Sequence, residues 1–206
     1  MAWLSTFTAR QRVDADLMAC SIDVQDMYMH WPLTQSAAAW CGFRVQRRGG
    51  GHDAYMWKAL PFGLGTSARV VQTATAAILQ PLQQAFRHAR AFIYLDDILL
   101  IAPRRHIELF TQKVFARLLD VGLSPNLDKC NLTPTARPEH LGVQLDIHRC
   151  TTSPTPRTVA AAVQAVRAYL ARPSRWNQKR AAGKVAWLWP YAQRPQYCDC
   201  GAAACT

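Results

Sequence analysis

Two adjacent carboxylates interrupt an otherwise uncharged, apolar stretch of the chain. Residues 91–102 read Ala-Phe-Ile-Tyr-Leu-Asp-Asp-Ile-Leu-Leu-Ile-Ala, and only Asp96 and Asp97 carry charge. A run this rich in isoleucine and aromatic residues is typical of a buried strand or a tight hairpin. Ionised carboxylates are costly to bury unless they are paired or bind a metal. We therefore expect them at the tip of a hairpin, between strands over residues 92–95 and 98–101, where they face a cation. The alternative is an Asp-Asp turn without chemistry, because Asp is common in turns.

A third carboxylate ends another short apolar strand. Asp23 follows Met-Ala-Cys-Ser-Ile at residues 18–22. If the two strands are neighbours in one sheet, Asp23 and Asp96 can lie close enough to hold hard divalent cations through oxygen ligands. Paired metal ions about 3.5–4 Å apart stabilise the attacking and leaving oxygens of a phosphoryl displacement, as in polymerases and nucleases. The pattern therefore indicates metal-assisted phosphoryl transfer.

Five motifs in colinear order over residues 21–146 resemble those of reverse transcriptases. They are the Asp23 strand, Leu-Pro-Phe-Gly-Leu at 60–64, Tyr-Leu-Asp-Asp at 94–97, the segment 123–130 that contains Lys129, and Glu-His-Leu-Gly-Val-Gln-Leu-Asp at 139–146. A lone Tyr-x-Asp-Asp is a weak signal, but five motifs in this order are specific. The second and third motifs look most like retroelements of the DIRS type, with Ty3/Gypsy-like retrotransposons and hepadnaviruses as nearby possibilities.

The resemblance implies an RNA-directed DNA polymerase, in which a primer 3′-hydroxyl attacks the α-phosphate of a deoxynucleotide. Its partners would be an RNA or DNA template with its primer, and dNTPs. Two Mg²⁺ ions, with Mn²⁺ as a substitute, would be held by Asp23, Asp96 and the Val24 carbonyl, with Asp97 as a nearby carboxylate. Lys129 matches a lysine close to the leaving pyrophosphate, which it would protonate.

The same resemblance assigns a nucleotide pocket. Tyr28 matches an aromatic residue that packs beneath the sugar and rejects a 2′-hydroxyl; an ordinary core tyrosine is the alternative. Phe62 and Gly63 match the segment that lines the nucleotide and template site. Met27 stands where relatives usually have a small residue, so we expect it to crowd this site. Residues Leu141, Gly142 and Val143 match the turn of the primer-grip hairpin.

Patterning around these motifs predicts an α+β palm, an antiparallel sheet with helices on one face. Apolar and polar residues alternate over 40–45 and 55–59, as in a hairpin. A helix is expected from Thr66 or Ser67, either of which can cap it, to about residue 89. A second, over 106–120, should pack on the sheet through the apolar positions Leu109, Phe110, Val114, Phe115, Leu118 and Leu119.

Composition shifts after residue 150. Thr-Thr-Ser-Pro-Thr-Pro at 151–156 reads as a linker, and helices are expected over 159–170 and 181–189. We divide the chain into a palm over 1–150, with the fingers largely absent, and a linker with the start of a helical thumb over 151–206. Four basic residues of the second part would contact nucleic-acid phosphates, a solvated face being the alternative: Arg172, Arg175, Lys179 and Arg180. Other domains of a retroelement polyprotein are expected beyond this chain.

Charge and cysteine content restrict the remaining choices. The formal net charge is +11 in 206 residues, which favours a polyanionic partner. No apolar run approaches the length of about 18–20 residues that a membrane span requires. The odd number of scattered cysteines indicates reduced thiols, so we expect an intracellular protein, in nucleus or cytoplasm. A zinc site at Cys198, Cys200 and Cys205 is a weak alternative because no second ligand cluster accompanies it.

Two competing functions remain open at this stage. One is a catalytically inactive reverse-transcriptase remnant that only binds nucleic acid, which the short segment before Asp23 favours. The other is a metal-dependent nuclease, which would leave Tyr28 and the Pro-Phe-Gly-Leu segment unused.

Overall fold

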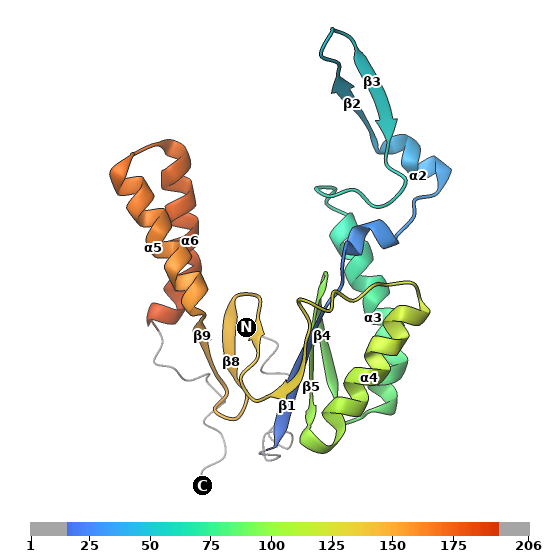
Figure 1. The fold of residues 1–206 in the computed structure, drawn as a ribbon, viewed down its shortest axis with the longest axis vertical. Coiled ribbons are helices and arrows are strands. Elements are labelled where there is room, and N and C mark those ends of the chain that lie inside the picture. Colours follow the sequence, from blue (N-terminus) through green and yellow to red (C-terminus); the bar gives the residue numbers. More distant parts are fainter. Residues whose placement is uncertain (1–15, 194–206) are drawn as a thin grey trace. The chain divides into compact units, whose positions relative to one another are not determined.

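A computed structural model describes residues 16–193 of the chain in two compact units (Figure 1). One unit is Cys20–Leu132, and the other combines Met1–Ala19 with Thr133–Thr206. The expectations for the first 15 residues and for a zinc site at Cys198, Cys200 and Cys205 lie outside the described residues. The assignment of palm and thumb to particular ranges stays a prediction.

A four-stranded sheet with the strand order β4-β5-β1-β6 is the centre of the first unit. Its strands are β1 (Leu17–Asp23), β4 (Arg90–Tyr94), β5 (Asp97–Pro103) and β6 (Asn131–Thr135). The chain enters the unit at Cys20 within β1 and leaves it at Leu132 within β6. Helices α3 (Ser67–Ala85) and α4 (Arg104–Asp120) lie on one face of the sheet (Figure 1). The predicted α+β class with antiparallel strands is confirmed.

Strand β5 and helix α4 form a large part of the core. Residues 98–102 of β5 are all buried, which matches the continuous apolar run in the sequence. On α4 the buried face is made by positions spaced three and four apart: Ile107, Phe110, Thr111, Val114 and Leu118. Leu109 and Leu119 were expected on that face, but they are 48% and 52% exposed. Leu109 lies two positions after Ile107, and Leu119 lies one position after Leu118. Both are therefore outside the three-and-four spacing of the buried face and are exposed to solvent.

The Asp-Asp hairpin forms, but its turn is shifted from the predicted one. Tyr94 pairs with Asp97, so the two-residue turn is Leu95-Asp96, and Asp97 is already the first residue of β5. Leu95 has a φ of 56°, a left-handed conformation that is unfavourable for a residue with a branched side chain. The expectation that both carboxylates sit at the tip is therefore wrong for Asp97.

The first unit also contains a projecting hairpin. The 3₁₀ helix η2 (Met27–His30) and helix α2 (Gln35–Trp40) lead to β2 (Gly42–Gln46) and β3 (His52–Met56). The pairing of Phe43 with Tyr55 and Val45 with Asp53 confirms the hairpin, with β3 beginning earlier than predicted.

Helix α3 begins at Ser67 as predicted, but its end and its capping differ from the prediction. It ends at Ala85 rather than near residue 89, because the chain must turn back before β4 begins at Arg90. Thr66 precedes the helix without a side-chain capping bond. The Ser67 hydroxyl is buried and has no hydrogen-bond partner among the described residues, so neither residue caps the helix.

The second unit contains a three-stranded sheet and two helices. Its elements are β7 (Glu139–His140), β8 (Val143–Asp146), β9 (Thr151–Pro154), α5 (Pro156–Ala171) and α6 (Arg175–Gln193). The expected linker is instead strand β9, which pairs with β8, and the second helix begins six residues earlier than predicted. Thr155 caps α5 by accepting a hydrogen bond from Thr158 N at 3.2 Å. Within the described range, none of the helices is long and apolar enough to span a bilayer.

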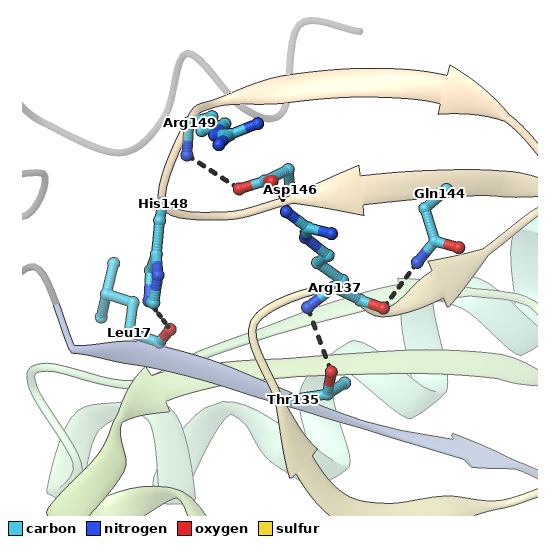
Figure 2. Close-up of polar contacts among 7 residues, drawn as sticks. All are labelled: Leu17, Thr135, Arg137, Gln144, Asp146, His148 and Arg149. Carbon is cyan, nitrogen blue, oxygen red and sulfur yellow. Dashed lines mark hydrogen bonds and ion pairs between the residues drawn. The ribbon is translucent and has the colours of Figure 1, made fainter.

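A cluster of polar contacts fixes the β8–β9 end of this sheet (Figure 2). Asp146 accepts a hydrogen bond from Arg149 N at 2.9 Å and pairs with Arg137 Nε at 3.1 Å. The Arg149 backbone N–H, followed by the Arg137 charge, lowers the pKa of the Asp146 carboxyl. Arg137 O in turn accepts a bond from the Gln144 amide. Asp146 therefore has a structural partner on each side.

The contrast between two neighbouring leucines of α4 gives a test of this core. Leu118 is fully buried, whereas Leu119 is 52% exposed. Leu118→Ala should lower the free energy of unfolding by about 2–5 kcal/mol, because it removes buried methyl groups and leaves a cavity. Leu119→Ala, the matched control, should change it by about 0.5 kcal/mol or less. Urea denaturation of both variants measures the difference, and equal losses would contradict this packing.

Candidate active site

Three backbone segments meet where β1 ends. They are residues 23–25, the turn of the β4–β5 hairpin, and the loop over 124–130. Three backbone hydrogen bonds join them: Val24 N to Asp96 O (2.9 Å), Gln25 N to Ser124 O (2.8 Å) and Asn126 N to Asp23 O (2.8 Å). Residues 23–25 are therefore held by main-chain bonds to the hairpin turn on one side and to the loop on the other.

The pairing also sets the direction of the Val24 carbonyl. Val24 lies opposite Pro125 in an antiparallel bridge, and the two bonds that flank this bridge are made by residues 23 and 25. The N–H and C=O of Val24 consequently both point away from Pro125, on the side where Val24 N bonds Asp96 O. Two residues later, Asp26 adopts a φ of 48°, which ends the extended segment and begins η2.

The three carboxylates predicted from sequence lie close enough to repel one another. Burial raises the pKa of Asp97, and the negative charges of Asp96 and Asp23 raise it further, while the Lys129 ammonium lowers it. The Asp23 side chain is 13% exposed. The structure thus brings together Asp23, Asp96 and Asp97 at one end of adjacent strands β1 and β5.

Lys129 joins this group as its nearest cation. Its Nζ lies 3.5 Å from Asp23 Oδ1, and its side chain is 64% exposed. The turn that places it is closed by a bond from Lys129 N to Asn126 O at 3.1 Å. The next residue, Cys130, accepts a hydrogen bond on Sγ from Asp23 N at 3.4 Å, which anchors the strand end that carries this carboxylate.

A pocket of about 340 Å³ opens beside these residues. It is lined by Val24, Gln25, Asp26, Met27, Tyr28, Phe62, Asp96, Asn126 and Lys129. The rings of Tyr28 and Phe62 lie 4.8 Å apart at 53°, a tilted contact that fixes one wall. Met27 is 2% exposed, so most of its side chain packs into the core. Gly63, with a φ of 81°, follows Phe62 without lining the pocket.

The donor set fits a hard divalent cation. In the described part of the chain, no group of three or more His, Cys, Asp or Glu side chains is arranged to hold a metal ion. Two carboxylates with a backbone carbonyl, however, match Mg²⁺, which keeps several waters and binds through one or two carboxylates plus substrate phosphates. Burial raises the pKa of Asp97 most, and the charges of Asp96 and Asp23 raise it further; a bound cation would offset the contribution of these two charges.

A second, separate pocket lies within the other unit. Its volume is about 470 Å³, and it is lined by Leu141, Gly142, Thr158, Lys179, Arg180, Gly183 and Lys184. Leu141 and Gly142, with φ values of 52° and 74°, form the two-residue turn between β7 and β8, as such turns require. Val143 is the first residue of β8 rather than part of the turn. Of the four predicted basic contacts, Lys179 and Arg180 line this pocket, and Arg172 and Arg175 do not.

Several site residues were not found from the sequence. Asn126 and Cys130 reach Asp23 through hydrogen bonds, and Lys184 adds a cation to the second pocket. Gln72, on α3, bonds the backbone of the Asp-Asp hairpin. The sequence holds no signal for Gln72, because α3 contains four glutamines and nothing in the spacing links position 72 to position 95.

Comparisons with known proteins agree with this geometry. Residues 5–145 match the sequence profile of the family described as reverse transcriptase (RNA-dependent DNA polymerase). The chain is 26% identical over 142 residues to Protein P of duck hepatitis B virus (strain Germany/DHBV-3), covering 68% of this chain and 17% of that protein. The chain is 29% identical over 140 residues to Protein P of duck hepatitis B virus (isolate Shanghai/DHBVQCA34), again covering 68% of this chain and 17% of that protein.

A retroviral protein is similar over a shorter range. The Gag-Pro-Pol polyprotein of Human T-cell leukemia virus 2 is 27% identical over 117 residues, which are 55% of this chain and 8% of that polyprotein. The chain therefore spans only 17% or less of the length of these curated relatives.

The charge balance of the site predicts how Asp97 titrates in metal-free protein. The folded pKa of Asp97 lies above its ordinary value of 3.8. At a pH between these two pKa values, folding is therefore accompanied by the uptake of a proton at Asp97. The contribution of Asp97 to stability is then largest below 3.8 and is lost as the pH rises through the folded pKa. Lys129→Met should raise the folded pKa further, because it removes the charge that lowers it.

Carboxyl ¹³C NMR titration in EDTA measures this pKa directly. Lys113→Met, which removes an exposed lysine from α4, is the matched control and should leave the Asp97 titration unchanged. If Lys129→Met also leaves it unchanged, the ammonium is not close to the three carboxylates.

Proposed function

Because the chain belongs to the reverse transcriptase (RNA-dependent DNA polymerase) family, we propose that it catalyses RNA-directed DNA synthesis as a polymerase domain of a retroelement. In this reaction a primer 3′-hydroxyl attacks the α-phosphate of a dNTP, and pyrophosphate leaves. The observation that carries the proposal is the 340 Å³ pocket, whose lining combines charged and aromatic side chains: Asp96, Lys129, Tyr28 and Phe62. Two further carboxylates, Asp23 and Asp97, lie beside it. A DIRS-type or Ty3/Gypsy-like origin stays a prediction.

The acidic residues are proposed to bind divalent cations. Asp23 and Asp96 would hold two Mg²⁺ ions with the Val24 carbonyl, and Asp97 would remain the neighbouring carboxylate. When bound, such ions lower the pKa of the attacking hydroxyl and neutralise charge on the triphosphate. The main-chain bonds of Val24, Gln25 and Asn126 support this role, because they keep the two carboxylate-bearing segments at a fixed separation.

Lys129 and Tyr28 are assigned to the two ends of the nucleotide. The exposed ammonium of Lys129 can contact the leaving phosphates and give a proton to pyrophosphate. Tyr28 is proposed to fill the space beneath C2′ of the sugar, with Phe62 holding its ring from the side. Gly63 then lets the backbone approach the nucleotide and template without a side chain.

The second unit is proposed to bind the primer–template. Lys179, Arg180 and Lys184 line the same pocket as the turn formed by Leu141 and Gly142, so the cations can contact phosphates while the turn contacts the primer end. Val143, Arg172 and Arg175 are assigned to the same surface on the resemblance alone. Other domains of a polyprotein are proposed partners, since one relative is named a Gag-Pro-Pol polyprotein.

Removal of the negative charge of Asp96 tests the catalytic proposal. Asp96→Asn should reduce extension of a primed RNA template with Mg²⁺ by at least about 10³-fold, or about 4 kcal/mol in activation free energy. Asp128→Asn, an exposed residue of the neighbouring loop, should keep nearly full activity. A parent chain that binds primer–template but does not extend it would instead favour the inactive, nucleic-acid-binding alternative.

Tyr28 provides a test of sugar selection. Tyr28→Ala should raise incorporation of ribonucleotides while dNTP use stays within about tenfold, roughly 1.4 kcal/mol. The reason is steric, because the ring occupies the space that a 2′-oxygen would need. Single-nucleotide extension with competing dTTP and UTP measures the ratio. If Tyr28→Ala discriminates as well as the parent, Tyr28 is a wall residue without this role.

A further inference from the structure

One side chain of α3 makes two hydrogen bonds to the backbone that leads into the strained hairpin position. Gln72 Oε1 accepts a hydrogen bond from Leu95 N at 3.0 Å, and Gln72 Nε2 donates to Ile93 O. Leu95 lies between these bonds and Asp96, and its φ of 56° is a conformation that leucine rarely adopts. Gln72 is half-buried and lies outside the lining of the 340 Å³ pocket.

Gln72 can form both bonds because β4 is the edge strand of the described sheet. Ile93 and Leu95 direct these backbone groups away from β5, where no strand pairs with them. A buried or half-buried edge needs such partners. Gln83, three turns later on α3, does the same for Ala91, whose N–H bonds its Oε1 at 3.0 Å.

The two glutamines differ in what they hold. Ala91 pairs with Leu100 in the regular part of the ladder, where strand pairing already defines the backbone. Leu95 lies in the turn, and the carboxylates of Asp96 and Asp97 follow it directly. A local change of Leu95 from the left-handed to an ordinary conformation would reorient the peptide that leads into Asp96.

We propose that Gln72 is a positioning residue, whose amide holds Leu95 in the left-handed conformation that presents Asp96 at the pocket. This inference rests on the proposed polymerase function for its effect on turnover, but its structural part does not. It assigns to α3 a role in the catalytic geometry, beyond covering the sheet. Mere capping of a sheet edge, the role of Gln83, is the alternative to be separated.

The first measurement does not depend on activity. Gln72→Met, which keeps the size of the side chain but removes both bonds, should speed hydrogen exchange at Leu95 N by about fivefold or more in the metal-free chain. Gln83→Met is the matched control and should speed exchange at Ala91 without affecting Leu95. Unchanged exchange at Leu95 in Gln72→Met would overturn the inference.

The second measurement is primer extension by the full chain. Gln72→Met should lower kcat by roughly 10²-fold, the loss expected from a displacement of about 1 Å, with KM for dNTP within about threefold. Gln83→Met should keep kcat within about twofold. A kcat for Gln72→Met equal to that of Gln83→Met would mean that both residues only cap the edge.

A double-mutant cycle connects the effect to the backbone of residue 95. Glycine adopts positive φ readily, so in the Leu95→Gly background the loss from Gln72→Met should shrink by about tenfold or more. An undiminished loss would show that Gln72 acts elsewhere. If the parent chain extends no primer, the proposed function fails, while hydrogen exchange at Leu95 still decides whether Gln72 holds the turn.

Discussion

The mutual repulsion of three carboxylates at the end of β1 is the constraint on which the site depends. Burial raises the pKa of Asp97 most, and the negative charges of Asp96 and Asp23 raise it further. The segments that carry them cannot move apart, because main-chain hydrogen bonds join residues 23–25 to both Asp96 and the loop over 124–126. Lys129 offsets the repulsion only in part, since an ammonium that is 64% exposed interacts weakly through water. A site that stays acidic under these conditions is suited to attract divalent cations.

The pocket next to the carboxylates combines features that a charged nucleotide needs. Asp96 and Lys129 contribute opposite charges to its lining, and Tyr28 and Phe62 contribute aromatic surface. A dNTP has the same division, with charged phosphates at one end and an apolar sugar face and base at the other. The left-handed Asp26 makes this arrangement possible, because it turns the chain out of β1 and into the short helix that carries Tyr28. Strand and pocket wall are thus built by consecutive residues.

Helix α3 has two structural tasks that its sequence does not separate. Its buried positions, such as Val71 and Leu79, pack on the sheet in the ordinary way. Two of its four glutamines, Gln72 and Gln83, bond backbone groups of the β4 edge that no neighbouring strand of the described sheet pairs with. Keeping Leu95 left-handed costs roughly 1–3 kcal/mol, which the surrounding contacts must offset. Gln72 bonds Leu95 itself and Ile93, two residues before it. The same side chain therefore satisfies the edge of the sheet and acts on the conformation of the turn.

The sequence by itself determined the features that depend on neighbouring residues. These are the apolar strand that ends at Asp23, the strand over 98–101, a hairpin within 40–59, the helices α3 to α6 and the order of the motifs, since periodicity and turn chemistry are local. The hairpin at 139–146 was expected from the family resemblance. The tertiary structure decided which faces are buried and which distant groups meet. Leu118 and Leu119 look equally apolar in sequence, yet only the first faces the sheet. Thr151–Pro154 has a linker's composition but becomes a strand because β8 offers a free edge. Gln72 reaches Leu95 across 23 positions, a contact that exists only because α3 packs against the edge of β4.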